Sequence, residues 1–474
     1  MLKRLKARRH EARKRREREQ RRAMSRRSLL KYSIAAGAAL SIPRWKVFEI
    51  LERSGGKALA AEAACHPTNR SVHIVAGDGG FAWFQLLWPH NDVAAAGNAN
   101  FAFHAPGQQV LAQGTDRPLT FAPQTPWQSI AGPRQVTALM SGSNETHRRN
   151  PTTATSFGDG TSMLAAAASL QSTNPTLVPV ITVQNVPYGT APGAPAQARV
   201  GNSAGMVDLF SSAASKAGGA LENAADADLY RAHYQTLYSL NAAASRSTAR
   251  SSFLTASGAA GLLGKNFADA LVPTPDDLAR YGIDGGSRNQ LRELAGGLIT
   301  TAKAFSLGLT SMVVLPAMQD DPHGAFNNMA GVQTTTATLG ALLNGFMDDL
   351  MAIEDPGCTG TKLGDNTVIT VHGDTPKTPL QRSGWPDGTP GNSNWMYVLG
   401  AGHLRSGWFG GIDRNGTART FDPATGNDST RPSAQMAAPA SAAVTYAVAK
   451  GDMRRVRDFY DGEDISGIIR EDQM

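Results

Sequence analysis

Three short Val-rich runs in the C-terminal half of the chain constrain its fold most strongly. They are residues 311–315 (Ser-Met-Val-Val-Leu), 367–371 (Thr-Val-Ile-Thr-Val) and 395–399 (Trp-Met-Tyr-Val-Leu). Runs of four or five mainly apolar residues with little polar alternation are typical of strands buried on both faces of a parallel sheet. A sheet of this kind needs helices on both of its faces, so the rest of the chain has to supply them.

Patterns of strand and helix alternate along the rest of the chain. Further strands are predicted at 71–76, 135–140 and 177–183, and helices at 162–170, 287–306, 332–353 and 439–450. Strand, helix, strand in this order indicates a parallel sheet. We therefore predict an α/β fold with a mostly parallel central sheet and helices on both faces, and we predict that residues 203–270 form a helical insertion or lid.

Titratable side chains follow three of the predicted strands at the point where each strand ends. In open α/β sheets, ligands bind just beyond the carboxyl ends of the strands. We expect these side chains to line one pocket at that edge. They are Asp78, Asp320, Asp321, His323, His372 and Asp374.

The charge of the chain is concentrated at its N-terminus. The formal net charge is +7, but residues 1–27 alone hold 14 Lys/Arg and three Glu. The remaining residues carry 32 basic and 36 acidic side chains, a net charge of −4. The body of the protein is mildly acidic, which argues against nucleic-acid binding as its main role.

The basic N-terminus contains an export signal. Residues 25–31 read Ser-Arg-Arg-Ser-Leu-Leu-Lys and are followed by a modest apolar run at 32–42. This pattern is similar to the twin-arginine consensus, and the apolar run is too short to be a permanent membrane span. We predict a basic tail and twin-arginine segment at 1–64, a domain at 65–474, and a periplasmic or secreted protein that engages the twin-arginine export machinery. The alternative is a basic helical arm that stays attached, and translation starting at Met24 rather than Met1 remains open.

The chain has two cysteines, Cys65 and Cys358. Two thiols are too few for a metal–thiolate cluster, but an oxidising compartment would allow one disulfide bond. The alternative is two unpaired thiols.

Four motifs after residue 289 occur in an order that resembles a known group of proteins. They are Asp-Pro-His at 321–323, Gly-Asp-Thr-Pro-Lys at 373–377, Gly-Asn-Ser-Asn at 391–394 and Val-Leu-Gly-Ala-Gly at 398–402. With the first strand and the closing segment 462–469, they resemble an uncharacterised bacterial family that is exported by twin arginines and belongs to the alkaline phosphatase/arylsulfatase-like superfamily. The resemblance covers residues 70–470 and implies that superfamily's fold.

The chain departs from this family at three places. Relatives carry a Glu and an Arg in the turn that here reads Val-His-Gly-Asp at 371–374, and an Asp-His pair where this chain has Asn-Ser-Asn at 392–394. The sulfatase signature Cys/Ser-x-Pro-x-Arg is missing, and Cys358 follows Asp-Pro-Gly instead. These differences put the full metal site of the superfamily in question.

The resemblance implies ester hydrolysis with a cation held by Asp and His side chains, which would neutralise the ester oxygens and activate a hydroxyl nucleophile. The candidate metal ligands are Asp78, Asp321, His323, His372 and Asp374. Mixed carboxylate and imidazole ligands suit Zn or Mn, and a carboxylate-rich version would suit Mg or Ca. The alternative is that these residues form turns and caps. The Gly-rich turn at 77–80 lacks the spacing of a dinucleotide fingerprint, so we expect no nucleotide cofactor.

A hydroxyl nucleophile is expected after the predicted strand 135–140. The candidates are Ser141 and Ser143, with His147 as the nearby base. The alternative is that they are ordinary turn residues, since no Gly-x-Ser-x-Gly motif is present.

Two functions remain open at this point, and the sequence does not decide whether the chain is an enzyme. The first is a metal-dependent hydrolase of phosphate or sulfate esters. The second is a non-catalytic envelope protein that keeps the fold, has lost part of the metal site, and binds a small anionic ester or an envelope partner.

Overall fold

The structure is a computed structural model, and it describes residues 68–75, 80–90, 92, 110–123, 125, 134–144, 156–174, 176–211, 266–318, 320–372, 376–379, 384–385, 390–400 and 402–470. The chain divides into two compact units, one of Met1–Ala64 with Ser211–Phe267 and one of Cys65–Phe210 with Ala268–Met474. Almost all described residues belong to the second unit, which is the subject below. The predicted insertion at 203–270 falls mainly on residues 212–265, outside the described residues.

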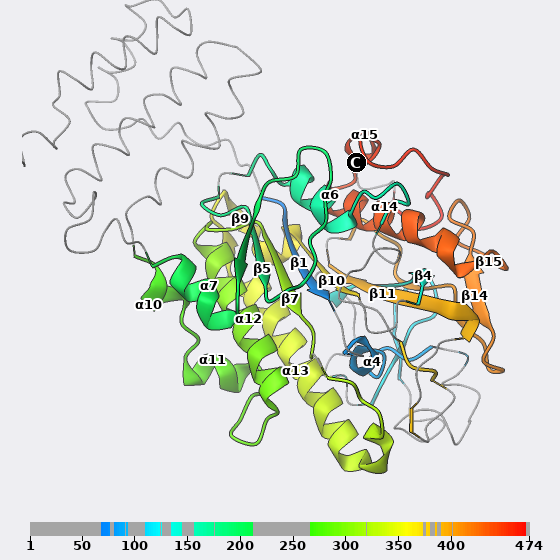
Figure 1. The fold of residues 1–474 in the computed structure, drawn as a ribbon, viewed down its shortest axis with the longest axis horizontal. Coiled ribbons are helices and arrows are strands. Elements are labelled where there is room, and N and C mark those ends of the chain that lie inside the picture. The colour runs from blue at the N-terminus through cyan, green and yellow to red at the C-terminus, as the bar shows by residue number, and fades with distance from the viewer. Residues whose placement is uncertain are drawn as a thin grey trace, which may run out of the picture. The chain divides into compact units, whose positions relative to one another are not determined.

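An eight-stranded sheet forms the centre of this unit, in the order β12-β4-β11-β10-β1-β7-β5-β6 (Figure 1). Seven strands run in one direction, and β11 alone runs against its two neighbours. The α/β fold with a mostly parallel sheet is thus confirmed. The strands are β1 (Arg70–Val75), β4 (Val136–Ser143), β5 (Val180–Val183), β6 (Gln197–Val200), β7 (Met312–Pro316), β10 (Thr367–His372), β11 (Ser393–Leu399) and β12 (Gly407–Phe409).

The prediction for the strand at 395–399 was wrong in direction. This strand, β11, pairs antiparallel with both β10 and β4, although all seven of its residues are buried as expected. A parallel neighbour needs a crossover connection, usually a helix, of a dozen or more residues. In the described part of 373–392, the regular structure is the three-residue 3₁₀ helix η4 (Pro390–Asn392), and no crossover helix is seen.

Helices cover both faces of the sheet (Figure 1). One face carries α6 (Met163–Leu170) and α14 (Ala437–Val448), whose apolar residues share one core with Val314 of β7 and Val368 of β10. The opposite face carries α12 (Asn289–Ser306) and α13 (Met329–Ala352). All six residues of β1 are buried between these layers, and full burial of each Val or Ile side chain contributes roughly 1.5–3 kcal/mol.

Shorter elements complete the described part of the unit. The helices are α4 (Phe81–Phe84), α7 (Ser203–Leu209), α10 (Ala268–Leu271), α11 (Pro275–Arg280), α15 (Met453–Val456), η2 (Ala325–Asn327), η3 (Leu363–Asn366) and η5 (Ser433–Met436). The strands pair as β2 (Val110–Leu111) with β3 (Thr120–Phe121), β8 (Glu354–Asp355) with β9 (Cys358–Lys362), and β13 (Gly411–Ile412) with β14 (Ala418–Phe421) and β15 (Asp428–Ser429). None of the described helices is long and apolar enough to cross a membrane.

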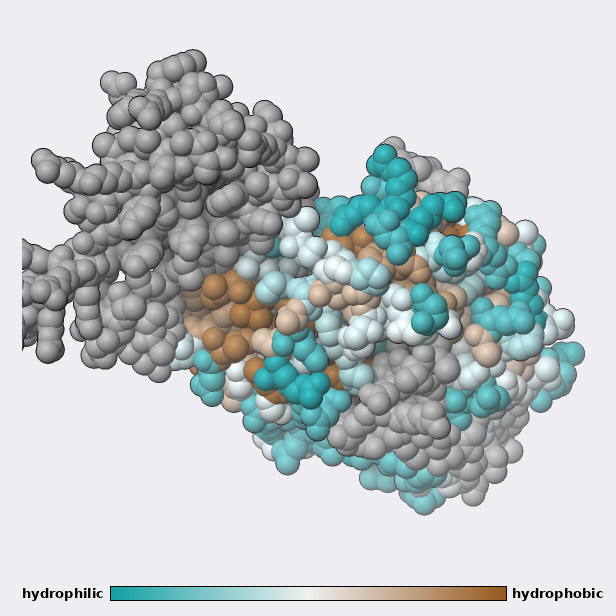
Figure 2. All heavy atoms as spheres, turned by 45° about the horizontal axis from the view of Figure 1, so that its top comes forward, coloured by the Kyte–Doolittle hydropathy of each residue, from teal (hydrophilic) through white to brown (hydrophobic). Residues whose placement is uncertain are grey.

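Two further features concern covalent and surface properties. Cys358 is disulfide-bonded, as the first of the two alternatives for the cysteines predicts. Figure 2 shows a hydrophobic area of surface on the side where α7 and α10 lie. Leu209, the last residue of α7, and Val272, which follows α10, are 37% and 48% exposed. Both residues stand close in sequence to segment 212–265, so exposed apolar surface occurs where the described chain is interrupted.

Candidate functional site

The carboxyl ends of three parallel strands meet in one row of the sheet. Val75, the last residue of β1, is aligned with His372, the last residue of β10, and with Pro316, the last residue of β7. The segments that follow these strands therefore leave the sheet at a common edge, as expected for a ligand site in an α/β fold.

Three polar side chains from two of these segments come into contact at this edge. Asp321 and His323 follow β7, and Lys377 follows β10. Lys377 Nζ lies 3.1 Å from Asp321 Oδ1 and 3.1 Å from His323 Nε2, and His323 Nε2 lies 3.0 Å from Asp321 Oδ2. We call these three residues the edge cluster.

Local structure fixes both sides of the edge cluster. Asp321 Oδ1 accepts a hydrogen bond from the backbone N–H of His323 at 3.3 Å, and this bond closes a short turn around Pro322. His323 Nδ1 lies 3.3 Å from the carbonyl oxygen of Gly384. Because a carbonyl can only accept, we place a proton on Nδ1. Nε2 can then accept from the Lys377 ammonium in the neutral ring, or donate to Asp321 Oδ2 in the protonated ring.

The members of the edge cluster differ in their access to solvent. The side chains of His323 and Asp321 are 45% and 32% exposed, whereas the Lys377 side chain is fully buried. The Lys377 carbonyl accepts from Gln85 Nε2 at 3.2 Å, which ties this segment to the residues after α4. A ligand arriving from solvent would therefore meet His323 and Asp321 first, with the ammonium of Lys377 behind them.

Sequence reasoning did not select Lys377 as a site residue, although it ends the Gly-Asp-Thr-Pro-Lys motif. A lysine after a strand is usually solvated, so its burial against Asp321 is visible only in the fold. The signal that could have found it is its motif, which stands at a strand end in the same way as the Asp-Pro-His motif does.

Asp320 lies beside the edge cluster and pairs with another group. Its carboxylate forms an ion pair with Arg288, the residue that precedes α12. The Arg288 guanidinium also lies over the ring of Trp83, 5.2 Å from its centroid. This ion pair joins the start of α12 to the segment that carries Asp321.

His372 does not lie on the exposed side of this edge. Side chains alternate along β10, so His372 shares a face with Val368, which packs in the core with residues of α6 and α14. Both ring nitrogens are buried and have no hydrogen-bond partner in the structure. Burial lowers the pKa of His372 to about 3, so the ring is neutral at physiological pH.

A second buried histidine stands near His372, with the ring centroids 6.2 Å apart and the rings edge to face. This residue, His73, is hydrogen-bonded on both nitrogens, to Thr370 Oγ1 at 2.7 Å and to Ser71 Oγ at 2.9 Å. Burial, with a smaller contribution from His372, holds the pKa of His73 well below its usual range. The His73 ring thus has no nitrogen left for a metal ion or a substrate.

The two candidate nucleophiles belong to β4 and not to a following turn, which corrects the predicted strand end at Met140. Ser141 stands at an irregularity where β4 pairs with β11, between the pairs Met140–Trp395 and Gly142–Asn394. Its Oγ is fully buried and has no hydrogen-bond partner. Ser143 pairs with Ser393, so the end of β4 lies beside the Asn-Ser-Asn motif, whose last two residues begin β11.

Three of the predicted site residues, Asp78, Asp374 and His147, lie outside the described residues. Among the residues that the structure describes, Asp321 and His323 come together, and His372 is buried on one face of the sheet. No group of three His, Cys, Asp or Glu side chains within this part of the chain is arranged to hold a metal ion.

Comparison of the chain with protein-family models, with curated proteins and with solved structures gives no match. The candidate site therefore has to be interpreted from its own geometry.

Proposed function

We propose that this chain is an exported protein with an alkaline phosphatase-like fold that binds a small phosphate or sulfate ester at the edge cluster. The observation that carries the proposal is the contact of Lys377 Nζ with Asp321 Oδ1 at 3.1 Å. It brings together the Asp-Pro-His and Gly-Asp-Thr-Pro-Lys motifs of the resemblance, which 49 residues (324–372) separate in the sequence, so their contact is a product of folding.

The chemistry of the edge cluster suits the recognition of an anionic ester. His323 is the exposed member, and a ring N–H of its imidazole can donate a hydrogen bond to an ester oxygen. The buried ammonium of Lys377 lies directly behind it, where the dielectric is lower than in water, and its charge is paired with that of Asp321. Asp321 contacts both groups and so fixes their positions.

Several other features support the proposal. The eight-stranded sheet with a single reversed strand and helices on both faces agrees with the α/β core that the resemblance implies. The closing segment 462–469 reaches the main domain through a bridge between Ile469 and Leu404. The twin-arginine motif at 25–31 supports a periplasmic or secreted location.

Metal-dependent ester hydrolysis is the second candidate, and one observation favours it. Asp321 Oδ1 and His323 Nε2 face a common point, which is taken by Lys377 Nζ at 3.1 Å from each. A carboxylate and an imidazole that converge on one cation are also the ligands of Zn and Mn sites. The other proposed ligands of such an ion are Asp78 and Asp374, outside the described residues, so we derive no step through a metal ion.

Calorimetric titration of the purified protein with inorganic phosphate and with sulfate tests the first proposal. We expect binding of at least one anion, and its loss in Lys377→Met and His323→Ala. The matched control is Lys362→Met, because Lys362, the last residue of β9, donates to the carbonyl of Ala352 at the end of α13, away from the edge cluster. If the unaltered protein binds neither anion, the proposal is wrong.

Elemental analysis and hydrolysis assays separate the two candidates. Two results together would replace binding by metal-dependent catalysis as the function. The protein would contain stoichiometric Zn or Mn that is lost in His323→Ala, and it would hydrolyse p-nitrophenyl phosphate or sulfate in a reaction that chelation abolishes. Anion binding that survives chelation, without hydrolysis, would support the binding protein.

A further inference from the structure

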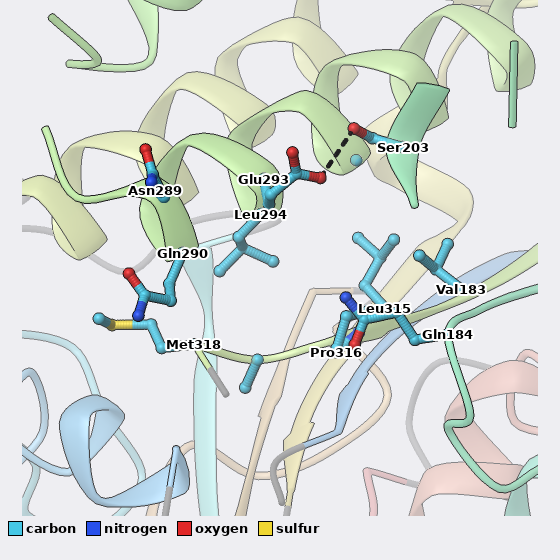
Figure 3. Close-up of a pocket in the computed structure, with 12 residues that line it drawn as sticks. Val183, Gln184, Ser203, Asn289, Gln290, Glu293, Leu294, Leu315, Pro316 and Met318 are labelled. Carbon is cyan, nitrogen blue, oxygen red and sulfur yellow. Dashed lines mark hydrogen bonds between the residues drawn. The ribbon is translucent and has the colours of Figure 1, made fainter. Parts of the chain in front are cut away.

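A pocket opens beside the edge cluster, between the carboxyl ends of β5 and β7 and the first turns of α12 (Figure 3). Its volume is about 290 Å³. Ligand pockets range over roughly 300–1,000 Å³, so this one suits a molecule the size of a single sugar. The pocket also lies where α/β sheets bind their ligands.

The polar lining of the pocket is rich in carboxamides. Gln184, Asn289 and Gln290 each offer both a donor and an acceptor group. In Figure 3, Gln290 and Met318 lie on the left of the view, the pair formed by Ser203 and Glu293 lies at the upper centre, and Gln184 lies on the right. Ser203 Oγ donates to Glu293 Oε2 at 3.3 Å. Groups that both donate and accept match hydroxyls, which do the same.

The charge of the lining excludes the anionic part of an ester. No Lys, Arg or His is among the described residues that line the pocket, and its one formal charge is the carboxylate of Glu293. The remaining surface is largely apolar and includes Leu294 and Leu315. A neutral molecule that presents several hydroxyls and carbon–hydrogen surface fits this lining better than a phosphate or sulfate does.

The pocket is held by closely packed elements. A Cβ atom on Gly297 would lie 2.9 Å from Leu315 Cδ2, so α12 and β7 approach as closely as glycine permits. Gln184 has a left-handed backbone with φ of 59°, and its N–H donates to the Val200 carbonyl at 2.7 Å. These contacts fix the backbone of α12, of β7 and of the turn after β5, which carry the lining side chains.

The pocket and the edge cluster share one segment of chain. Met318 lines the pocket, and Asp321 stands three residues later, so their Cα atoms are at most about 11 Å apart. The ion pair of Arg288 with Asp320 fixes the start of α12 to the same segment. One small molecule can therefore contact both places.

We propose that the pocket holds the organic part of the ester, and that this part is a sugar or another polyol. The inference rests on the proposed function for the placement of the ester group at the edge cluster. The ligand class is thus a sugar or polyol phosphate or sulfate, with its hydroxyls on Gln184, Gln290 and Glu293.

Three probes test the two places separately by calorimetry: inorganic phosphate, glucose 6-phosphate and butyl phosphate, which lacks the hydroxyls. We expect the unaltered protein to prefer glucose 6-phosphate to butyl phosphate by about tenfold, the value of roughly one good hydrogen bond. Gln290→Leu and Glu293→Ala should each remove most of that preference and leave the affinity for inorganic phosphate unchanged. Gln333→Leu on α13, which is outside the pocket lining, is the matched control.

Saturation-transfer NMR with glucose alone distinguishes the failure of the pocket from the failure of the proposed function. Equal affinity for glucose 6-phosphate and butyl phosphate, unaffected by Gln290→Leu, would contradict the role of the pocket. Binding of inorganic phosphate by the same protein would still support the proposed function. No binding of phosphate, but a glucose signal that Gln290→Leu abolishes, would overturn the proposed function and leave a sugar pocket. Absence of glucose, phosphate and ester binding would overturn both.

Discussion

Lys377 Nζ contacts Asp321 Oδ1 at 3.1 Å and thereby joins the segments that follow β7 and β10. The lysine side chain is fully buried and the aspartate side chain is 32% exposed, so the pair lies between the interior and solvent. A fully exposed pair would contribute little to stability, because water and salt screen it. Because the ammonium is buried, the loss of its partner Asp321 should lower stability, since an unpaired buried charge is costly.

A double-mutant cycle with Asp321→Asn and Lys377→Met measures this contact. We expect a coupling energy of about 1 kcal/mol, above the value for most exposed pairs and reduced by the solvent access of Asp321. The measurement is urea denaturation of the four proteins. Additive effects of the two substitutions would show that the pair does not hold the edge cluster together.

Arg70 and Asp355 form a second ion pair, which is buried on both sides. Arg70 Nη1 lies 2.7 Å from Asp355 Oδ2, and the two side chains are 1% and 0% exposed. Asp355 also accepts from the backbone N–H groups of Thr68 and Gly357. We expect Asp355→Ala to lower the free energy of unfolding by about 3–5 kcal/mol, because it leaves the Arg70 guanidinium buried without its partner.

Denaturation of Arg454→Ala gives the comparison for this prediction. Arg454 pairs with Asp452, but its side chain is 91% exposed, so its loss should leave the free energy of unfolding nearly unchanged. Similar losses for Asp355→Ala and Arg454→Ala would contradict the role assigned to burial.

Local sequence patterns were sufficient to locate the strands but not to orient all of them. Val-rich runs gave β7 and β10 to within a residue, because burial on both faces demands apolar side chains at every position. The direction of β11 depends on how the chain returns from β10, and an apolar run is the same when it is read in either direction. The lack of a helical pattern between these strands was the available sign of an antiparallel return.

The candidate site was predictable only in part. The alignment of Val75 with His372 and Pro316 follows from parallel pairing, and it brings the strand ends together as expected. The alternation of side chains then turns His372 toward the core shared with α6 and α14, which depends on which face each helix covers. The burial of Lys377 likewise depends on tertiary packing that no local pattern encodes.

The buried histidines predict a pH dependence of stability. Burial lowers the pKa of His372 to about 3, and burial with the nearby Arg419 lowers that of His90 to about 3. Below pH 6.5 the unfolded chain binds a proton at each site that the folded chain does not bind, so stability falls as the pH falls from about 6.5 toward 3. The slope is about 1.4 kcal/mol per pH unit for each fully unprotonated site.

Replacing His372 isolates its share of this slope. Urea denaturation of His372→Met between pH 5 and 8 gives the free energy of unfolding as a function of pH. Below pH 6.5 its slope should be smaller than that of the unaltered protein by the contribution of about one proton, and above pH 7.5 the two slopes should not differ. An unchanged slope in the variant would show that His372 is not kept neutral by the fold.

The proposed export signal predicts where the protein accumulates. Arg26 and Arg27 would form the arginine pair of the twin-arginine motif. We expect the double substitution Arg26→Lys and Arg27→Lys to keep the protein in the cytoplasm, whereas Arg21→Lys with Arg22→Lys, outside the motif, should not. Immunoblots of periplasmic and cytoplasmic fractions measure the outcome, and equal export of both variants would exclude the twin-arginine assignment.

Gly467 tests the packing of the closing segment against the rest of the domain. A Cβ atom at this position would lie 2.2 Å from the backbone nitrogen of Gly426 and 2.5 Å from the carbonyl carbon of Thr425. Neither backbone atom can move as a flexible side chain would, so Gly467→Ala should lower the free energy of unfolding by about 2–3 kcal/mol. Gly201 has nothing within 4 Å of the same atom, so Gly201→Ala should change stability by less than about 0.5 kcal/mol. Urea denaturation of both variants measures this difference, and equal stability would mean that segment 462–469 does not pack on the turn at 422–426 as the structure has it.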